Sequence, residues 1–179
     1  MDFESMIDPR RPYADEIATL KTLDAFQDVQ VLRGHMSCRL RELMFDFFLF
    51  RQGKDTPERE KIALFLDHIE ALSSGAPTTD ELEKAPVLNQ WCAIYDSDTV
   101  ILIGYVAGHP YIRDQGRART SLVLQVHPDK GWARTWNRFY RLGSLSRLTF
   151  FEWQHEGKIS PRMQIIDFNG DPTQRAGKT

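Results

Sequence analysis

Hydrophobic positions recur every three or four residues through the first half of the chain, which is the spacing of one buried face of an α-helix. This pattern predicts three long helices, close to residues 13–23, 36–50 and 57–72. In the second of them, Phe45, Phe48 and Leu49 lie outside the main stripe and make the segment apolar almost all round. Such a helix is expected to be covered on every side, by the core or by a partner.

Residue types that favour helix ends mark the boundaries of the third helix. Thr56 and Pro57 suit an N-cap and a first helical turn, and the run Ser-Ser-Gly-Ala-Pro at residues 73–77 suits its end. Thr78 and Glu81 have the spacing of a capping box, so a short fourth helix is expected to begin there. The predicted buried stripe of the third helix is Ile62, Phe65, Leu66, Ile69 and Leu72.

Near residue 90 the hydrophobic period changes to the alternation that is typical of β-strands. Residues 91–95 and 99–107 flank an Asp-Ser-Asp turn and predict a hairpin. Residues 120–126 predict a half-buried strand. After the turn Pro-Asp-Lys-Gly, residues 132–142 are expected to return antiparallel to that strand.

Together these elements predict an α+β fold. An acidic helical part, residues 1–88, would pack on a basic part, residues 89–168, that forms a small antiparallel sheet or a small barrel. Within the basic part, residues 163–168 suit a closing strand, and residues 145–153 fit either a helix or a strand. Residues 169–179 hold no large apolar side chain and are expected to form a flexible tail.

Composition narrows the class of protein without naming a function. The chain has 179 residues, of which 41% are hydrophobic and 27% charged, and these values exclude collagen-like, coiled-coil and wholly disordered chains. No run of about eighteen apolar residues is present, so no membrane partner is expected. Cys38 and Cys92 are too few for a disulfide scaffold and are expected to be reduced thiols. Since the N-terminus is unlike a signal peptide, a cytoplasmic protein is expected.

The net charge of −2 conceals a division along the chain. Residues 1–98 hold 11 Lys and Arg against 19 Asp and Glu, whereas residues 99–147 hold 8 basic residues against 2 acidic ones. Such an asymmetry predicts partners better than the total charge does. The acidic half fits either a solvated surface or a face that engages a basic protein, and an anionic partner is expected at the basic half.

The basic half contains a run in which arginine and aromatic residues alternate. In a continuous strand over residues 132–141, one face would carry Trp132, Arg134, Trp136, Arg138 and Tyr140. Arg117 and Arg119 lie just before the strand that is expected to pair with it. Rings that stack on bases and guanidinium groups that hold phosphates suit single-stranded nucleic acid. The same residue types also form protein interfaces and ordinary cores, so these alternatives remain open.

One residue is considered for catalysis. His109 titrates near neutral pH and could act as a general base, although no Asp, Glu, Ser or Cys stands beside it in the sequence. His35 and Cys38 are spaced to share a helical face, but a zinc site needs further ligands at a recognisable spacing. We therefore expect no metal and no cofactor.

Four short motifs in the basic half form a wider pattern. They are Gly108-His109-Pro110, Arg119-Thr120-Ser121, Gly131-Trp132-Ala133-Arg134-Thr135 and Arg138-Phe139-Tyr140-Arg141-Leu142-Gly143. Over residues 104–143 the chain resembles a family of small uncharacterised proteins from alphaproteobacteria and from their plasmids and phages. That family has no assigned activity, so the resemblance implies a domain type and a mobile-element neighbourhood. It does not cover the helical half.

These observations predict a non-enzymatic binding or regulatory protein that contacts nucleic acid or a nucleoprotein through the basic–aromatic sheet. The residues expected at phosphates are Arg117, Arg119, Arg134 and Arg138, and those expected to stack on bases are Trp132, Trp136 and Tyr140. One alternative is an inhibitor or adaptor from a mobile element, which would bind a protein through the apolar helix or the acidic face. Another is a small enzyme that uses His109.

Overall fold

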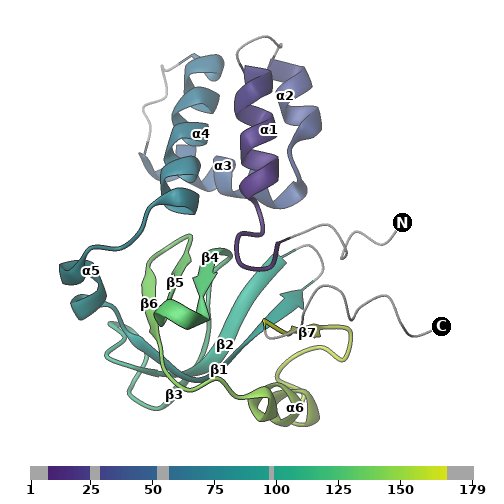
Figure 1. Ribbon diagram of the computed structural model, residues 1–179. Helices are drawn as coiled ribbons and strands as arrows, with labels where there is room; N and C mark the ends of the chain where they lie inside the picture. The colour runs from purple at the N-terminus through teal and green to yellow at the C-terminus, as the bar shows by residue number, and fades with distance from the viewer. Residues whose placement is uncertain (1–7, 25–28, 52–56, 97–98, 169–179) are drawn as a thin grey trace. The chain divides into compact units, whose positions relative to one another are not determined.

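The structure, a computed structural model, divides the chain into two compact units (Figure 1). The residues that it describes are 8–24, 29–51, 57–96 and 99–168. The helical unit contains residues 11–76, and the sheet unit contains residues 8–10 and 77–168. The division falls earlier than the predicted boundary after residue 88, because the short helix and the strand that follow residue 77 belong to the sheet unit.

Four helices make up the described part of the helical unit. They are α1 (Ala14–Asp24), α2 (Val29–His35), α3 (Cys38–Arg51) and α4 (Glu58–Ser74). The predicted first and third helices are confirmed as α1 and α4, whereas the predicted second one is α3, preceded by the separate short helix α2. Leu72, at the end of the predicted stripe of α4, is half-buried. The fully buried core side chains include Ile17, Leu20, Leu40, Ile62, Phe65, Leu66 and Ile69.

Among the described residues, helix α3 is not covered on every side by the core, so the alternative of cover by a partner stays a prediction. Leu40, Met44 and Phe47 are buried, but the Phe45 side chain is 62% exposed. The Phe47 ring is centred 5.9 Å from the ring of Phe65, and this contact joins α3 to α4. The all-round apolar sequence of α3 is therefore not matched by all-round burial.

Capping residues set the start of the short helix α5 (Thr79–Lys84), as predicted. The Glu81 amide donates to Thr78 Oγ1 at 3.2 Å, and the Thr78 amide donates to Glu81 Oε2 at 2.8 Å, which completes the capping box. Helix α4 has Pro57 at its N-cap position. Thr56, the predicted N-cap, lies outside the described residues.

Seven strands form one mixed sheet in the order β3-β2-β1-β6-β5-β4, with β7 paired to β1 (Figure 1). The strands are β1 (Val87–Asp96), β2 (Thr99–Ala107), β3 (Gly116–Arg119), β4 (Val123–His127), β5 (Trp132–Thr135), β6 (Phe139–Leu142) and β7 (Gln164–Ile166). Neighbouring strands are antiparallel except β1 and β6, which run parallel. Among the described residues no ladder joins β3 to β4. The predicted α+β fold, with helices first and a sheet after them, is confirmed. The sheet differs from the expected antiparallel sheet or barrel in two respects: β6 pairs with β1 in parallel, and the sheet stays open.

The other predictions for the sheet unit can be checked element by element. The β1–β2 hairpin is confirmed, and β7 confirms the closing strand. The ambiguous segment after residue 144 forms helix α6 (Arg147–His155), and the Pro-Asp-Lys-Gly turn contains a 3-10 turn, Pro128–Lys130. The predicted tail, residues 169–179, lies outside the described residues. In the part of the chain that the structure describes, no helix has the length and apolar character to cross a membrane.

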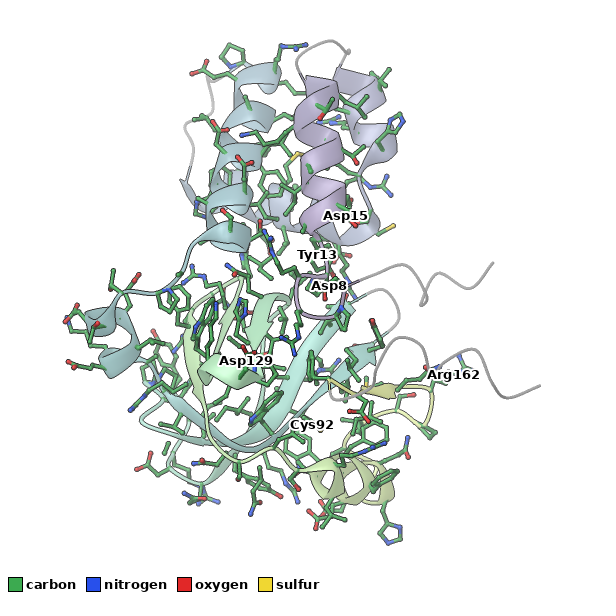
Figure 2. All side chains as sticks on the ribbon, in the orientation of Figure 1. Asp8, Tyr13, Asp15, Cys92, Asp129 and Arg162 are labelled. Atoms are coloured by element: carbon green, nitrogen blue, oxygen red, sulfur yellow. The ribbon has the colours of Figure 1, made fainter. Side chains whose placement is uncertain are left out.

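Cys92 lies in an apolar cluster with side chains of α6, where it packs with Phe150 and Trp153 (Figure 2). Burial raises the pKa of its thiol to about 12. Cys38 is exposed, and both cysteines are unpaired, as predicted.

Strand β1 changes partners along its length. Its register shifts between Asn89 and Cys92, and Gln90 adopts a φ of 46°, so the strand is bulged at this point. Before the bulge β1 pairs with β6, and after it β1 pairs with β7. Gly104 in β2 lies against the bulge, since a Cβ at this position would stand 2.8 Å from the carbonyl oxygen of Asn89.

The predicted single strand over residues 132–142 is wrong, because the chain reverses within it. Strands β5 and β6 are joined by a tight turn. In this turn the Thr135 amide donates to the Arg138 carbonyl oxygen at 2.9 Å, and the Arg138 amide donates to Thr135 Oγ1 at 3.3 Å. The side chains that would alternate along one strand are therefore divided among two strands and a turn.

Candidate nucleic-acid interface

The rings of Trp132 and Tyr140 belong to the core. Each side chain is 5% exposed. Trp132 packs against His127 with 4.3 Å between the ring centroids, and Tyr140 lies in the main apolar cluster of the sheet unit. Desolvation raises the pKa of the Tyr140 hydroxyl. The expectation that these two rings lie exposed on one face for stacking is therefore wrong, because the hairpin register places them on opposite faces and each is covered on its own side.

Arg117 and Arg119 lie on β3, which pairs with β2 and not with the 132–142 segment. Arg117 forms an ion pair with Glu156 at 2.5 Å, and its guanidinium lies 5.7 Å from the centre of the Trp153 ring. Arg119 forms an ion pair with Asp96. Both guanidinium groups thus have carboxylate partners within the sheet unit, which reduces what they can offer to a phosphate.

Arg134 and Trp136 are half-buried at the end of β5 and in the turn that follows it. The guanidinium carbon of Arg134 lies 4.5 Å from the centre of the Phe139 ring, as a cation–π pair. Hydrogen bonds with Thr78 lower the pKa of Glu81, and the positive charge of Arg134 lowers it further. The Trp136 amide donates to the carbonyl oxygen of Leu122 at 2.8 Å.

Arg138 lies beside an exposed ring that the alternation pattern did not include. Its guanidinium carbon is 5.9 Å from the centre of the Tyr111 ring, and the Tyr111 side chain is 85% exposed. In the described chain no carboxylate forms an ion pair with Arg138. Tyr111 follows Gly108-His109-Pro110 outside any strand, so strand periodicity gave no reason to select it. A signal in the sequence was its position in a loop after the apolar strand of residues 99–107, since binding residues are common in loops.

His109 holds the loop that presents Tyr111. The amides of Tyr111 and Ile112 both donate to His109 Nδ1, each at 3.2 Å. Desolvation lowers the pKa of the imidazole, and the positive charge of Arg138 lowers it further. The two amide hydrogen bonds support a structural role for His109 in this loop.

Backbone conformation closes the same loop at both ends. Gly108 and Gln115 have positive φ values of 71° and 62°. The Gly108 amide donates to Asp114 Oδ1 at 2.8 Å, and the Gln115 amide donates to the carbonyl oxygen of Val106 at 2.7 Å. The loop is therefore tied to its own ends, and the exposed Tyr111 ring projects from an ordered base.

A groove of about 480 Å³ lies between α5, the Gly108–Pro110 segment and the β5–β6 turn. Its acidic side chains have partners nearby. Asp80 pairs with Lys84 at 2.7 Å, and Glu81 is held in the capping box. Arg134 and Arg138 line the opposite wall. The groove thus has two guanidinium groups on one wall and carboxylates with local partners on the other.

We name the Tyr111–Arg138 surface after its two most prominent members. It comprises His109, Tyr111, Arg134, Arg138 and Phe139. It combines one exposed ring with two guanidinium groups, which suits a ligand that has both a planar ring and a negative charge. No cluster of three or more His, Cys, Asp or Glu side chains that could hold a metal occurs among the described residues.

The fold and this surface define a small α+β protein with an exposed basic–aromatic face. The chain belongs to a family of unknown function, DUF6634, whose model matches residues 58–152. The match begins at α4 and ends within α6, so it includes the whole Tyr111–Arg138 surface. It also contains residues 104–143, which confirms the resemblance to an uncharacterised family. No curated protein and no solved structure matches the chain.

Proposed function

We propose that this protein binds single-stranded nucleic acid through the Tyr111–Arg138 surface, as a non-enzymatic regulatory protein. The observation that carries the proposal is the Tyr111 ring, 85% exposed and 5.9 Å from the guanidinium of Arg138. A large ring held in water on an ordered loop, beside a cation with no carboxylate partner among the described residues, has the chemistry of a base-stacking position next to a phosphate contact.

Each residue of the surface has one task in this proposal. A base stacks on Tyr111, Arg138 contacts the adjacent phosphate, and Arg134 contacts the next phosphate from the wall of the groove. Stacking of a base on an aromatic side chain contributes about 1–3 kcal/mol in comparable sites. Arg117 and Arg119 are left out, since each already has a carboxylate partner.

The test is fluorescence anisotropy of a labelled oligothymidylate, about 20 nucleotides long, titrated with the full chain at several salt concentrations. Tyr111→Ala is expected to weaken binding by roughly 5- to 100-fold, in line with the loss of one stacked base. The matched control is Phe151→Ala, which removes a ring that is 53% exposed on α6 and lies outside the proposed surface. This control is expected to leave the affinity unchanged.

The contribution of phosphate contacts is measured separately. Arg138→Ala is expected to reduce the slope of log affinity against log salt by about 0.7, the value for one contact to a single strand. Arg162→Ala removes the same charge from an exposed position elsewhere in the sheet unit and should leave the slope intact (Figure 2). Absence of binding at low salt, or equal losses in Tyr111→Ala and Phe151→Ala, would contradict the proposal.

The proposal also states the cellular compartment of the protein and the kind of genome that encodes it. We propose a cytoplasmic protein of alphaproteobacteria or of their plasmids and phages. Two unpaired cysteines support a reducing compartment. The test is the position of the coding sequence in several genomes: genes of plasmids or phages beside it would support this origin, and chromosomal housekeeping genes in every genome would contradict it.

A further inference from the structure

The helical unit contains a second groove, of about 540 Å³, between α2 and α3. Arg33 and Gly34 line it from α2, and Arg41, Met44, Phe45 and Phe48 line it from α3. The α3 residues follow the three- and four-residue spacing of one helix face, so the groove runs along the axis of α3. The groove lies wholly within the helical unit and shares no residue with the Tyr111–Arg138 surface.

The floor and one wall of this groove are apolar. Met44 is 7% exposed and forms part of the core, whereas Phe45 is 62% exposed and Phe48 is half-buried. Gly34 leaves open space on the facing helix, since a Cβ at this position would meet no atom within 4 Å. The groove is therefore open at Gly34, opposite the apolar side chains of α3.

The rim of the groove is basic. The Arg41 guanidinium donates to Cys38 Sγ at 3.2 Å, and within the described residues no carboxylate pairs with it. Lys61 Nζ lies 5.8 Å from the centre of the Phe48 ring. Arg33 pairs with Glu58. An occupant with carboxylates at its edges would thus meet Arg41 at the rim and Lys61 beside Phe48.

We propose that the α2–α3 groove binds an acidic amphipathic helix from a partner protein. Apolar side chains three and four residues apart on one face of that helix would pack against Met44, Phe45 and Phe48. Carboxylates beside that face would contact Arg41 and Lys61. This inference goes beyond the proposed nucleic-acid binding and does not depend on it, because the two surfaces lie in different units.

Charge and shape together favour this occupant over a polyanion. A base would stack on the exposed Phe45 ring, but nucleic acid has no aliphatic side chains to fill the apolar floor at Met44 and Phe48. An acidic amphipathic helix satisfies both requirements, and helix-in-groove recognition of this kind is common. The partner is thus defined by an apolar face with acidic borders.

The test uses two fluorescein-labelled synthetic helices of about sixteen residues, long enough to form a helix of several turns. Both carry leucine at positions i, i+3, i+4 and i+7, and one carries glutamate at the bordering positions where the other carries lysine. Fluorescence anisotropy with the full chain is expected to show saturable binding of the glutamate peptide. The lysine peptide is expected to bind at least about tenfold more weakly.

Gly34 provides a matched pair of variants. Gly34→Trp places a ring in the open space of the groove and is expected to weaken binding of the glutamate peptide more than about tenfold. Gly34→Ala adds only a methyl group that meets no neighbour, so binding should be retained. Circular dichroism of both variants shows whether α2 is preserved. Arg41→Glu should reduce the preference for the glutamate peptide over the lysine peptide.

Three results would overturn the inference. One is no binding of the glutamate peptide, and another is equal affinity for the two peptides. The third is unchanged affinity in the folded Gly34→Trp variant, which would place the peptide elsewhere. Loss of oligothymidylate binding in Tyr111→Ala is a separate measurement, so either proposal can fail alone.

Discussion

His109 accepts hydrogen bonds from the backbone around it, which favours its neutral form. Two amides donate to its Nδ1, so this nitrogen carries a lone pair and the ring proton resides on Nε2. Protonation would place an N–H group against two N–H donors and beside the positive charge of Arg138. The rings of Tyr111 and Tyr140 also flank the imidazole, with centroids 6.1 and 6.3 Å away. The protonation state of the His109 ring is thus coupled to the position of Tyr111, the proposed stacking residue.

This arrangement predicts that the stability of the loop falls as the pH is lowered. The pKa of His109 is lowered from its ordinary value of 6.5 by desolvation and then by the charge of Arg138. The neutral ring is therefore favoured in the folded loop, and its stabilising effect is fully present above pH 6.5. It is lost as the pH falls through the lowered pKa. The amide NMR signals of Tyr111 and Ile112 are expected to shift together, with a midpoint below 6.5.

The control for this titration is His109→Gln, whose amide oxygen can accept a hydrogen bond but does not titrate near neutral pH. In this variant the two amide signals should show no transition in the same range. A midpoint at or above 6.5 in the original chain would contradict the role assigned to the ring.

At the scale of elements, the bulge in β1 determines which strands meet. On one side, β1 pairs with β6 before the bulge and with β7 after it. On its other side, the bulge leaves room for only a glycine at position 104 of β2. A Cβ on Gly104 would lie 2.8 Å from the Asn89 carbonyl oxygen and 3.1 Å from the Cα of Trp91. Both are backbone atoms, so neither can move aside as a side chain would.

Gly104→Ala is therefore expected to destabilise the sheet unit by about 1–3 kcal/mol, which is typical of overpacking in a core. Urea unfolding followed by tryptophan fluorescence measures this change. Gly34→Ala is the control, since the same added methyl group meets no neighbour there and removes the conformational freedom of a helical glycine. It should stabilise the helical unit, as followed by circular dichroism. A neutral Gly104→Ala would show that the bulge relaxes.

At the scale of the whole molecule, each unit has its own core. Ile69 is fully buried in the helical unit, and Ile94 is fully buried in the sheet unit. The four tryptophans, Trp91, Trp132, Trp136 and Trp153, all belong to the sheet unit. Fluorescence therefore reports on one unit alone, whereas far-ultraviolet circular dichroism also follows the helices of the other.

Two small core truncations separate the units. Ile69→Val is expected to cost about 0.5–1.5 kcal/mol and to shift the circular dichroism transition in urea while leaving the fluorescence midpoint in place. Ile94→Val should shift the fluorescence midpoint by a similar amount. Coincident transitions by both probes in both variants would mean that the chain unfolds as one cooperative body.

Charge also acts at this scale. The basic excess of residues 99–147 is partly balanced inside the sheet unit, where Arg117 pairs with Glu156 and Arg119 with Asp96. The basic excess counted from the sequence is thus larger than the excess of positive charge that a partner would meet on the surface of the sheet unit. Arg134 and Arg138 lie on the wall of a groove, and their position there is the reason that the proposal assigns them to phosphates.

The sequence by itself determined the features that depend on neighbours along the chain. Helices α1, α4 and α5 follow from hydrophobic spacing and from the Thr78–Glu81 capping box, and the β1–β2 hairpin follows from two apolar runs around a turn. These signals act over a few residues, so their outcome does not require knowledge of the rest of the fold.

Only the tertiary structure decided which strands pair and which side chains are buried. The reversal after Thr135 placed Trp132 and Tyr140 on opposite faces, where both are buried. Strand β3 joined β2, and β6 joined β1 in parallel. Arg117 and Arg119 found carboxylate partners in other elements of the sheet unit. Each outcome depends on residues that are distant in sequence, and a one-residue change in register reverses the face of every side chain in a strand. For the same reason the exposed Tyr111 beside Arg138 became visible only once the chain was folded.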